Sequence, residues 1–251
     1  MAIAPFLAMT AAEFLAVPQL PNKIAWMACH FSPYGLGLSN LPKELPPGSL
    51  LMVDDVTPPH GHDPRLIAEQ LSGCVETLQC CAVLLDFQRK GDEETRSITE
   101  YLVSALPCPV IVSEFYANNL NCPVFLTPLP PSMPLEDYIL PWKDHAVWLE
   151  LGMDGEIITL TEKGADTSPL LFPDFQEKGF HEEALCCHNT IRTDEQSARF
   201  TLWRKQDDLE QLVTEAAKLG VVGAVGLYQE LGRYAAFQTA LPFGEGGSRN
   251  G

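Results

Sequence analysis

The chain has 251 residues, of which 46% are hydrophobic and 20% are charged, and its formal net charge is −17. This composition is typical of a globular protein with a sizeable core and excludes a disordered chain. The negative charge argues against nucleic acid or an anionic membrane as a partner, because polyanions would be repelled. No segment has about 18 consecutive apolar residues, so we expect no membrane span and an acidic, cytoplasmic protein.

The N-terminal segment MAIAPFLAMTAAEFLAVPQLP is apolar, but it has no basic residue before Lys23, and Glu13 interrupts it. A signal peptide needs a basic start and an uninterrupted apolar middle, so we expect a short helix that covers one end of the fold. The eight cysteines include no CxxC pair, and we interpret them as reduced thiols. Adjacent residues of a strand point to opposite faces, so the pairs at 80–81 and 186–187 are poor chelators. We expect no metal and no cofactor.

Short apolar runs alternate with helical stretches along the first half of the chain. The segment PPHGHDPRLIAEQLSG predicts a helix with Asp63 as N-cap and Pro64 at its first position. DEETRSITEYLVSAL (92–106) predicts an amphipathic helix with acidic residues in its first turn. Around these helices, we expect strands at 23–31, 49–55, 81–88, 109–115 and 123–128, of which 23–31 is expected to be the first.

The pattern changes in the second half. The segment 146–164 contains MDGE between two β-rich runs and predicts a hairpin. With the following residues it forms an expected β-rich insertion at about 146–196. Two further strands are expected at 197–204 and 221–230, joined by a helix that ends at Gly220. We expect one barrel domain over 1–242 and a disordered tail over 243–251.

Continuous apolar strands that alternate with helices indicate a parallel sheet buried on both faces. Seven or eight such strands in this length favour an α/β fold of the closed (β/α)8 type, a TIM-like barrel, with the insertion before its last two strands. Neither a GxGxxG nor a P-loop motif supports a nucleotide-binding fold.

Barrel sites lie at the C-terminal ends of the strands, and acids and aromatics recur there. Aromatic faces stack on sugar rings, and carboxylates bind hydroxyl groups and transfer protons, so these positions favour a sugar site. A carboxylate at a strand end is also often a cap or turn former, and a Trp such as Trp203 is often core packing. The candidates are Trp26, His30, Asp54, Asp55, Asp86, Gln88, Glu114, Tyr116, Trp203, Arg204, Tyr228 and Glu230.

The stretch CAVLLDFQRKG (81–91) resembles the fourth-strand motif D-x-x-D-x-D-x-E of family 18 glycoside hydrolases, the chitinase-like barrels. The C-terminal segment FTLWRKQDDLEQLVTEAAKLGVVGAVGLYQELG resembles the last two strands of that family, especially of its bacterial spore-lysin branch. In this resemblance the catalytic glutamate falls on Gln88 and the last aspartate on Asp86. The two earlier aspartates fall on Leu84 and Cys81, and the tryptophan of the eighth strand falls on Tyr228. The sixth-strand Tyr-Asp has no clear equivalent in PVFLTPLPPS.

The resemblance implies a mechanism in which the substrate's acetamide attacks the anomeric carbon. The glutamate donates a proton to the leaving oxygen, and the preceding aspartate positions the acetamide. Gln88 can hydrogen-bond to that oxygen but cannot protonate it, and general acid catalysis is worth about 10²–10⁴-fold.

Three hypotheses follow. The first is a barrel that binds N-acetylglucosamine-type glycans without family-type hydrolysis, with Asp86, Gln88, Tyr228 and Trp26 as contacts. The second is an active hydrolase in which Glu114 is the relocated proton donor, with Asp86 or Glu230 as its partner. The third is a non-catalytic barrel whose mouth binds a protein. For the glycan hypotheses, we expect a small oligosaccharide or a cell-wall fragment as the partner, and we leave the oligomeric state open.

Overall fold

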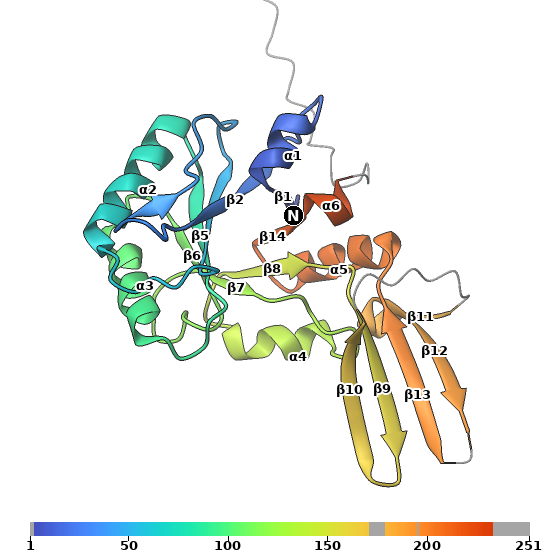
Figure 1. Ribbon diagram of the computed structural model, residues 1–251. Helices are drawn as coiled ribbons and strands as arrows, with labels where there is room; N and C mark the ends of the chain where they lie inside the picture. Colours follow the sequence, from blue (N-terminus) through green and yellow to red (C-terminus); the bar gives the residue numbers. More distant parts are fainter. Residues whose placement is uncertain (1–2, 171–178, 195, 233–251) are drawn as a thin grey trace, which may run out of the picture.

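In the computed structural model, which describes residues 3–170, 179–194 and 196–232, a closed barrel of parallel strands carries a separate antiparallel sheet (Figure 1). The barrel closes because the first strand pairs with both the second and the last. In spatial order, its eight strands are β1 (Phe6–Met9), β2 (Ile24–Phe31), β4 (Leu50–Asp54), β5 (Ala82–Asp86), β6 (Val110–Ser113), β7 (Val124–Leu126), β8 (Val147–Leu151) and β14 (Gly223–Leu227). The short β3 (Leu38–Ser39) pairs antiparallel with β2.

The predicted TIM-like barrel is therefore confirmed, but its strands are not all the expected ones. The strand expected to be the first is the second, because β1 precedes it inside the apolar N-terminal segment. The predicted short helix follows immediately as α1 (Ala11–Ala16), which starts with a capping box between Thr10 and Glu13. With β1 included, β5 is the fourth barrel strand.

Helices cover the outside of the barrel, and their sequences explain where they begin. Asp63 caps α2 by accepting a hydrogen bond from the Arg65 amide at 2.9 Å, and Asp92 caps α3 in the same way. Each helix buries the apolar face that its sequence predicts. The helical elements are α2 (Pro64–Leu78), α3 (Glu93–Ala105), α4 (Leu135–Ile139), the 3-10 helix η1 (Leu140–Trp142), α5 (Gln206–Lys218) and α6 (Tyr228–Leu231). None of the helices in the described residues has the length and apolar character that a membrane span requires.

The interior of the barrel is filled by a small apolar cluster that is distinct from the larger core under the helices. Phe6 of β1 contacts Trp148 of β8 inside the barrel, with ring centroids 5.8 Å apart. A Cβ atom at Gly223 would collide with the same Trp148 ring, so only glycine fits beside it. The barrel is thus a packed core below its C-terminal end.

The hairpin predicted around MDGE does not form, because its two halves belong to different sheets. The first half, β8, pairs in parallel with β7 and β14 and is a barrel strand. The second half, β9, pairs with β10 and β13 in the inserted sheet. That sheet contains β9 (Gly155–Thr161), β10 (Gly164–Leu170), β11 (Phe180–Glu182), β12 (Cys187–Thr193) and β13 (Ser197–Trp203), with the 3-10 helix η2 (Glu183–Leu185) between β11 and β12.

The β-rich insertion is confirmed, but its position is shifted along the chain. The segment 197–204, predicted to be a barrel strand, forms β13 of the inserted sheet, which projects from the side of the barrel near α4 (Figure 1). The tail predicted for 243–251 lies outside the described residues, and the single-domain boundary at 242 stays a prediction.

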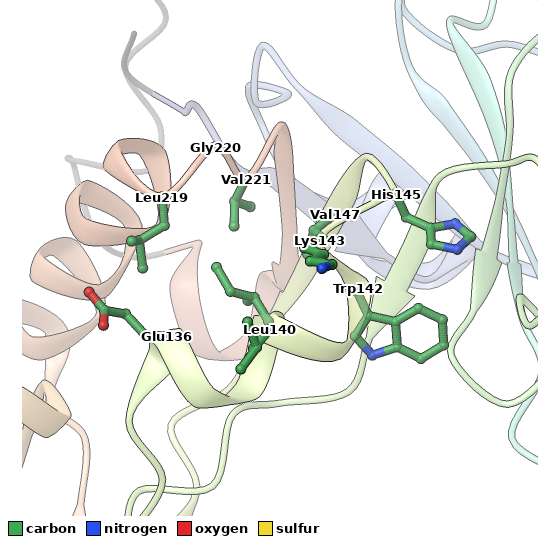
Figure 2. Close-up of a pocket in the computed structure, with 10 residues that line it drawn as sticks. Glu136, Leu140, Trp142, Lys143, His145, Val147, Leu219, Gly220 and Val221 are labelled. Atoms are coloured by element: carbon green, nitrogen blue, oxygen red, sulfur yellow. The ribbon is translucent and has the colours of Figure 1, made fainter.

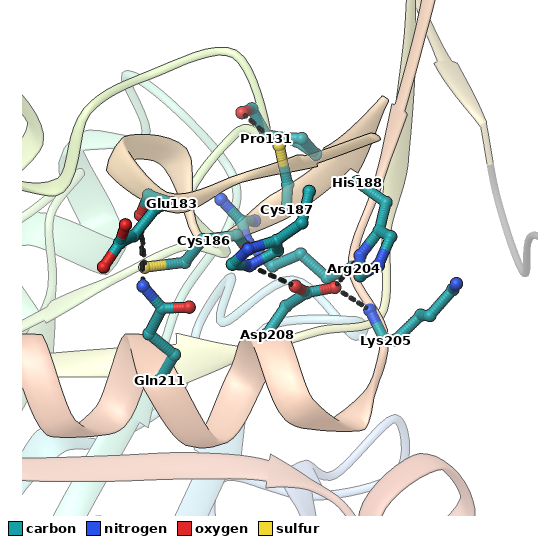
Figure 3. A network of polar contacts seen from close by, with 10 residues as sticks. Pro131, Glu183, Cys186, Cys187, His188, Arg204, Lys205, Asp208 and Gln211 are labelled. Atoms are coloured by element: carbon teal, nitrogen blue, oxygen red, sulfur yellow. Dashed lines mark hydrogen bonds and ion pairs between the residues drawn. The ribbon is translucent and has the colours of Figure 1, made fainter. Parts of the chain in front are cut away.

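A buried polar network joins the inserted sheet to the barrel (Figure 3). Arg204 follows β13, is 2% exposed, and donates hydrogen bonds to the carbonyl oxygens of Leu129, Pro130 and Cys186. The Cys187 thiol donates a weak hydrogen bond to the Pro131 carbonyl at 3.5 Å. The loop that follows barrel strand β7 is therefore bound to the base of the inserted sheet.

Asp208, near the start of α5, completes this network. Its carboxylate is buried and lies 2.8 Å from His188 Nδ1 and 3.2 Å from His181 Nε2. It also accepts a hydrogen bond from the Lys205 amide at 2.7 Å, which caps the helix. The buried carboxylate is thus held by α5 and by strands β11 and β12.

Candidate functional site

The barrel mouth, defined here as the C-terminal ends of the eight barrel strands, carries inward-facing carboxyl groups. Side chains of a strand alternate between the two faces. Met52, Leu84 and Trp148 contribute to the interior cluster. Two positions later, the same faces of β4, β5 and β8 therefore present Asp54, Asp86 and Glu150.

Asp86 and Gln88 are in direct contact at the end of the fourth barrel strand. The Gln88 amide donates a hydrogen bond from Nε2 to Asp86 Oδ1 at 2.5 Å. Burial raises the pKa of Asp86, the Gln88 hydrogen bond opposes that rise, and the charges of Asp54 and Asp55 add to it. Oδ2 of Asp86 accepts no hydrogen bond from the described residues and remains available in the mouth.

Asp55 and Tyr116 hold the loop after β5. The buried Asp55 carboxylate accepts hydrogen bonds from the backbone amides of Gln88 at 2.9 Å and Arg89 at 2.8 Å. The Tyr116 hydroxyl donates to the Arg89 carbonyl, and its ring is 1% exposed. These two predicted binding residues are thus placed to position Gln88 from behind.

Glu150 is the mouth residue that sequence reasoning missed. It lies on the inward face of β8, within a segment predicted to form a hairpin. Burial raises the pKa of Glu150 to about 8, and the charges of Asp86, Asp154 and Glu230 add to the rise. Within the described part of the chain, no group donates a hydrogen bond to its carboxyl. The alternation of apolar residues in AVWLEL was the signal that could have placed it in a barrel strand.

Glu114, the predicted relocated acid, has its carboxylate engaged by the next strand. Its Oε1 accepts hydrogen bonds from Thr127 Oγ1 at 2.6 Å and from the Thr127 amide at 3.2 Å. The Tyr138 hydroxyl of α4 donates to the Thr127 carbonyl at 2.8 Å. Burial raises the pKa of Tyr138 to about 12, and the nearby charges of Glu114 and Glu150 contribute to the rise. Tyr138 is therefore a second mouth residue that the sequence did not reveal.

His30 and Asp54 lie side by side at the ends of β2 and β4, where they are register partners. Burial raises the pKa of Asp54, whereas the Val56 amide and His30 oppose this rise. A bulge between Trp26 and Cys29 shifts the alternation of β2, so His30 faces the same side as Asp54. Both predicted residues are thus at the mouth.

The last barrel strand brings Tyr228 and Glu230 to the same end of the barrel on the short helix α6. Glu230 accepts a hydrogen bond from the Met153 amide at 3.0 Å, which links α6 to the segment after β8. Burial raises the pKa of Glu230, and the charge of Asp154 adds to the rise. Glu230 thereby lies in the same group of carboxyls as Glu150.

Three of the predicted residues lie elsewhere. Trp26 points to the outer side of β2, where it packs edge-on against Phe14 and donates a hydrogen bond to the Asn40 carbonyl at 3.0 Å. Trp203 belongs to the inserted sheet, is 1% exposed, and stacks on His188. The buried Arg204 binds backbone carbonyls at the base of that sheet. The structure brings none of these three to the mouth.

A separate pocket of about 410 Å3 opens between η1 and the end of α5 (Figure 2). Its lining includes Leu140, Trp142, Leu219 and Val221. Val147, the first residue of β8, also lines it, so this pocket lies at the opposite end of β8 from Glu150. The described residues contain no group of three or more His, Cys, Asp or Glu side chains arranged to hold a metal ion.

Comparison with solved structures identifies barrels of the same fold. A chitinase from Chromobacterium violaceum aligns over 94% of this chain and 97% of its own, with a TM-score of 0.55 and 11% sequence identity. The spore cortex-lytic enzyme SleL from Bacillus cereus aligns over 89% of this chain and 70% of its own, with a TM-score of 0.54 and 8% identity. At these identities the likeness concerns the fold.

Comparison of the sequence with family models and with curated proteins finds no match. The chain thus shares the fold of a chitinase and a spore cortex-lytic enzyme.

Proposed function

We propose that the barrel mouth binds oligosaccharides of the N-acetylglucosamine type, including cell-wall fragments, without the proton transfer that the family's glutamate performs. The observation that carries the proposal is the hydrogen bond from Gln88 to Asp86 at the end of the fourth barrel strand. In the resemblance to the chitinase-like motif, the acid falls on Gln88, whose amide is paired with the neighbouring aspartate. An amide cannot protonate a glycosidic oxygen.

The chemistry of the mouth supports a sugar ligand over a protein partner. Its inward side chains are carboxyls and hydroxyls, whereas protein-binding surfaces are enriched in apolar and aromatic residues at their centre. A carboxyl group that receives no hydrogen bond from the described residues, such as that of Glu150, can accept hydrogen bonds from sugar hydroxyls, and in its protonated form it can also donate one. The fold shared with a chitinase and a spore cortex-lytic enzyme supports the same ligand class.

Hydrolysis through Glu114 has weaker support, because Thr127 already binds its carboxylate twice. The cytoplasmic location stays a prediction, and it favours soluble fragments over an extracellular polymer.

Calorimetric titration with chito-oligosaccharides and muropeptide fragments tests the proposal. We expect binding by the wild type and at least a tenfold loss of affinity in Asp86→Ala, because the mouth loses a central acceptor. Glu162→Gln, in the exposed turn between β9 and β10, is the matched control and should bind normally. If the wild type binds neither class of ligand, the proposal fails.

A further inference from the structure

We propose that Glu150 and Asp86 form an acid–base pair at the mouth, which hydrolyses the bound glycan by a route in which the residue at position 88 donates no proton to the substrate. This inference rests on the proposed glycan site and adds an activity to it. Glu150 is the proton donor, and Asp86 is the base that activates water.

The placement of the two residues carries the argument. Asp86 ends the fourth barrel strand and Glu150 lies near the end of the seventh, so two strands, β6 and β7, separate them around the barrel. Both side chains are on inward faces, two positions above interior residues Leu84 and Trp148. The charge of Asp86 adds to the raised pKa of Glu150, as expected for two carboxyls that point into the same barrel mouth.

The hydrogen bonds assign the two roles. Gln88 donates to Oδ1 of Asp86, a contact that favours the charged form of this carboxyl and orients it. Glu150 receives no such donor from the described residues, so nothing on the protein stabilises its charged form. Of two neighbouring carboxyls, the one without donors keeps the proton.

The surroundings of Glu150 reinforce this assignment. Among the described residues, the ionisable groups that interact electrostatically with it are acids and a phenol: Asp86 from β5, Asp154 and Glu230 from the segments after β8 and β14, and Tyr138 from α4. Burial and these negative charges raise the pKa of Glu150 to about 8, so the group is mostly protonated at neutral pH. A general acid works best when its pKa lies near the working pH.

The chemical step balances with water as the only co-reactant. Glu150 gives its proton to the glycosidic oxygen as the bond between that oxygen and the anomeric carbon breaks, with the electron pair staying on the oxygen. Oδ2 of Asp86 takes a proton from a water molecule whose oxygen bonds to the anomeric carbon. The products are two sugars with free hydroxyl groups, and exchange with solvent returns the two carboxyls to their starting forms.

The test compares wild type, Glu150→Gln and Glu114→Gln on chitotetraose and on muropeptide fragments, with products followed by mass spectrometry and binding by calorimetry. We expect cleavage by the wild type and a loss of about 10²–10⁴-fold in kcat for Glu150→Gln, with affinity nearly unchanged. The kcat of the wild type should fall as pH rises through about 8, where the acid loses its proton, and Glu150→Gln should lack this fall.

A dinitrophenyl glycoside separates a proton donor from a residue that only shapes the site. Its leaving group needs no protonation, so Glu150→Gln should cleave this substrate at close to the wild-type rate. Slow cleavage of both substrates by a folded Glu150→Gln would overturn the assignment of Glu150 as the acid. A larger loss in Glu114→Gln than in Glu150→Gln would also overturn it.

The outcomes distinguish this inference from the proposed function. Binding without any cleavage by the wild type overturns the acid–base pair and leaves the glycan-binding proposal standing. Absence of binding to every ligand overturns both.

Discussion

The barrel mouth and the junction beneath the inserted sheet both hold ionisable groups away from water, but the two regions differ in the partners that these groups have. At the junction, Asp208 contacts two histidines and a backbone amide, and Arg204 donates to three carbonyls. At the mouth, the charges of Asp86 and Glu230 both add to the raised pKa of Glu150, and none of the ion pairs between described residues involves these three carboxyls.

This difference distinguishes ionisable groups that hold parts of the fold together from ionisable groups whose altered pKa values serve a function. A buried charge that is bound by several partners fixes the arrangement around it, and removal of one partner is costly. A group of carboxyls without cations destabilises the fold through repulsion and shifts its own pKa values. Such groups are typical of functional sites, where the shift itself is useful.

Replacement of Arg204 by Met should have the largest effect on stability. The variant leaves the Leu129, Pro130 and Cys186 carbonyls without their buried donor, and we expect a loss of about 3–5 kcal/mol in the free energy of unfolding. Urea denaturation measures the loss. Arg199→Met, on the exposed side of the same strand, should cost less than about 0.5 kcal/mol. Equal effects of the two variants would show that the junction is not a structural anchor.

Asp208→Asn should have an intermediate effect of about 2–3 kcal/mol. The amide keeps the size of the side chain but loses the negative charge that faces His181 and His188. Asp207→Asn, in the same helical turn but exposed, is the control and should cost a few tenths of a kcal/mol. Thermal unfolding at neutral pH distinguishes them. A stabilising Asp208→Asn would mean that the buried charge costs more than its contacts return.

Glu150→Gln should have the smallest effect, and its sign should depend on pH. The folded pKa of Glu150 is raised to about 8, so the wild type loses stability as pH rises from the unfolded-state pKa through 8. The variant cannot ionise, so it should exceed the wild type by about 1–2 kcal/mol at pH about 9, after allowance for solvent screening at the open mouth, and match it at pH about 4. Urea denaturation at several pH values tests this, and parallel curves for the two proteins would contradict the raised pKa.

Much of the barrel could be predicted from local sequence, because strands buried on both faces are continuous apolar runs and capping residues mark where helices begin. The N-terminal strand Phe6–Met9 was missed because it is only four residues long and merges with the helix that follows it. The MDGE segment was misread because a local turn signal competes with parallel pairing to strands distant in the chain. The local sequence of a strand does not show which sheet the strand joins, because its pairing partners are distant in the chain.

The site was predictable to the extent that it follows strand ends. Asp54, Asp86 and Gln88 were placed correctly at the end of the barrel by that rule alone. Trp26 was not, because it is the third residue of the eight-residue strand β2 and packs on the outer side of that strand, away from its C-terminal end. Glu150 was missed because its strand was assigned to a hairpin of the insertion, and Tyr138 reaches the mouth from a helix outside any strand-end motif.

The inserted sheet leaves and re-enters the rest of the chain at one point, because Gly155 and Trp203 are register partners in neighbouring strands. The whole segment could therefore be replaced by another in evolution or by protein engineering. The two ends that a replacement has to join, at Gly155 and Trp203, are only one strand spacing apart, about 5 Å. A replacement would have to supply partners for the barrel groups that now bind the inserted sheet, which are the carbonyls of the loop after β7 and the Asp208 carboxylate of α5. The barrel itself would keep its closure, because every one of its strand pairings lies outside the exchanged segment.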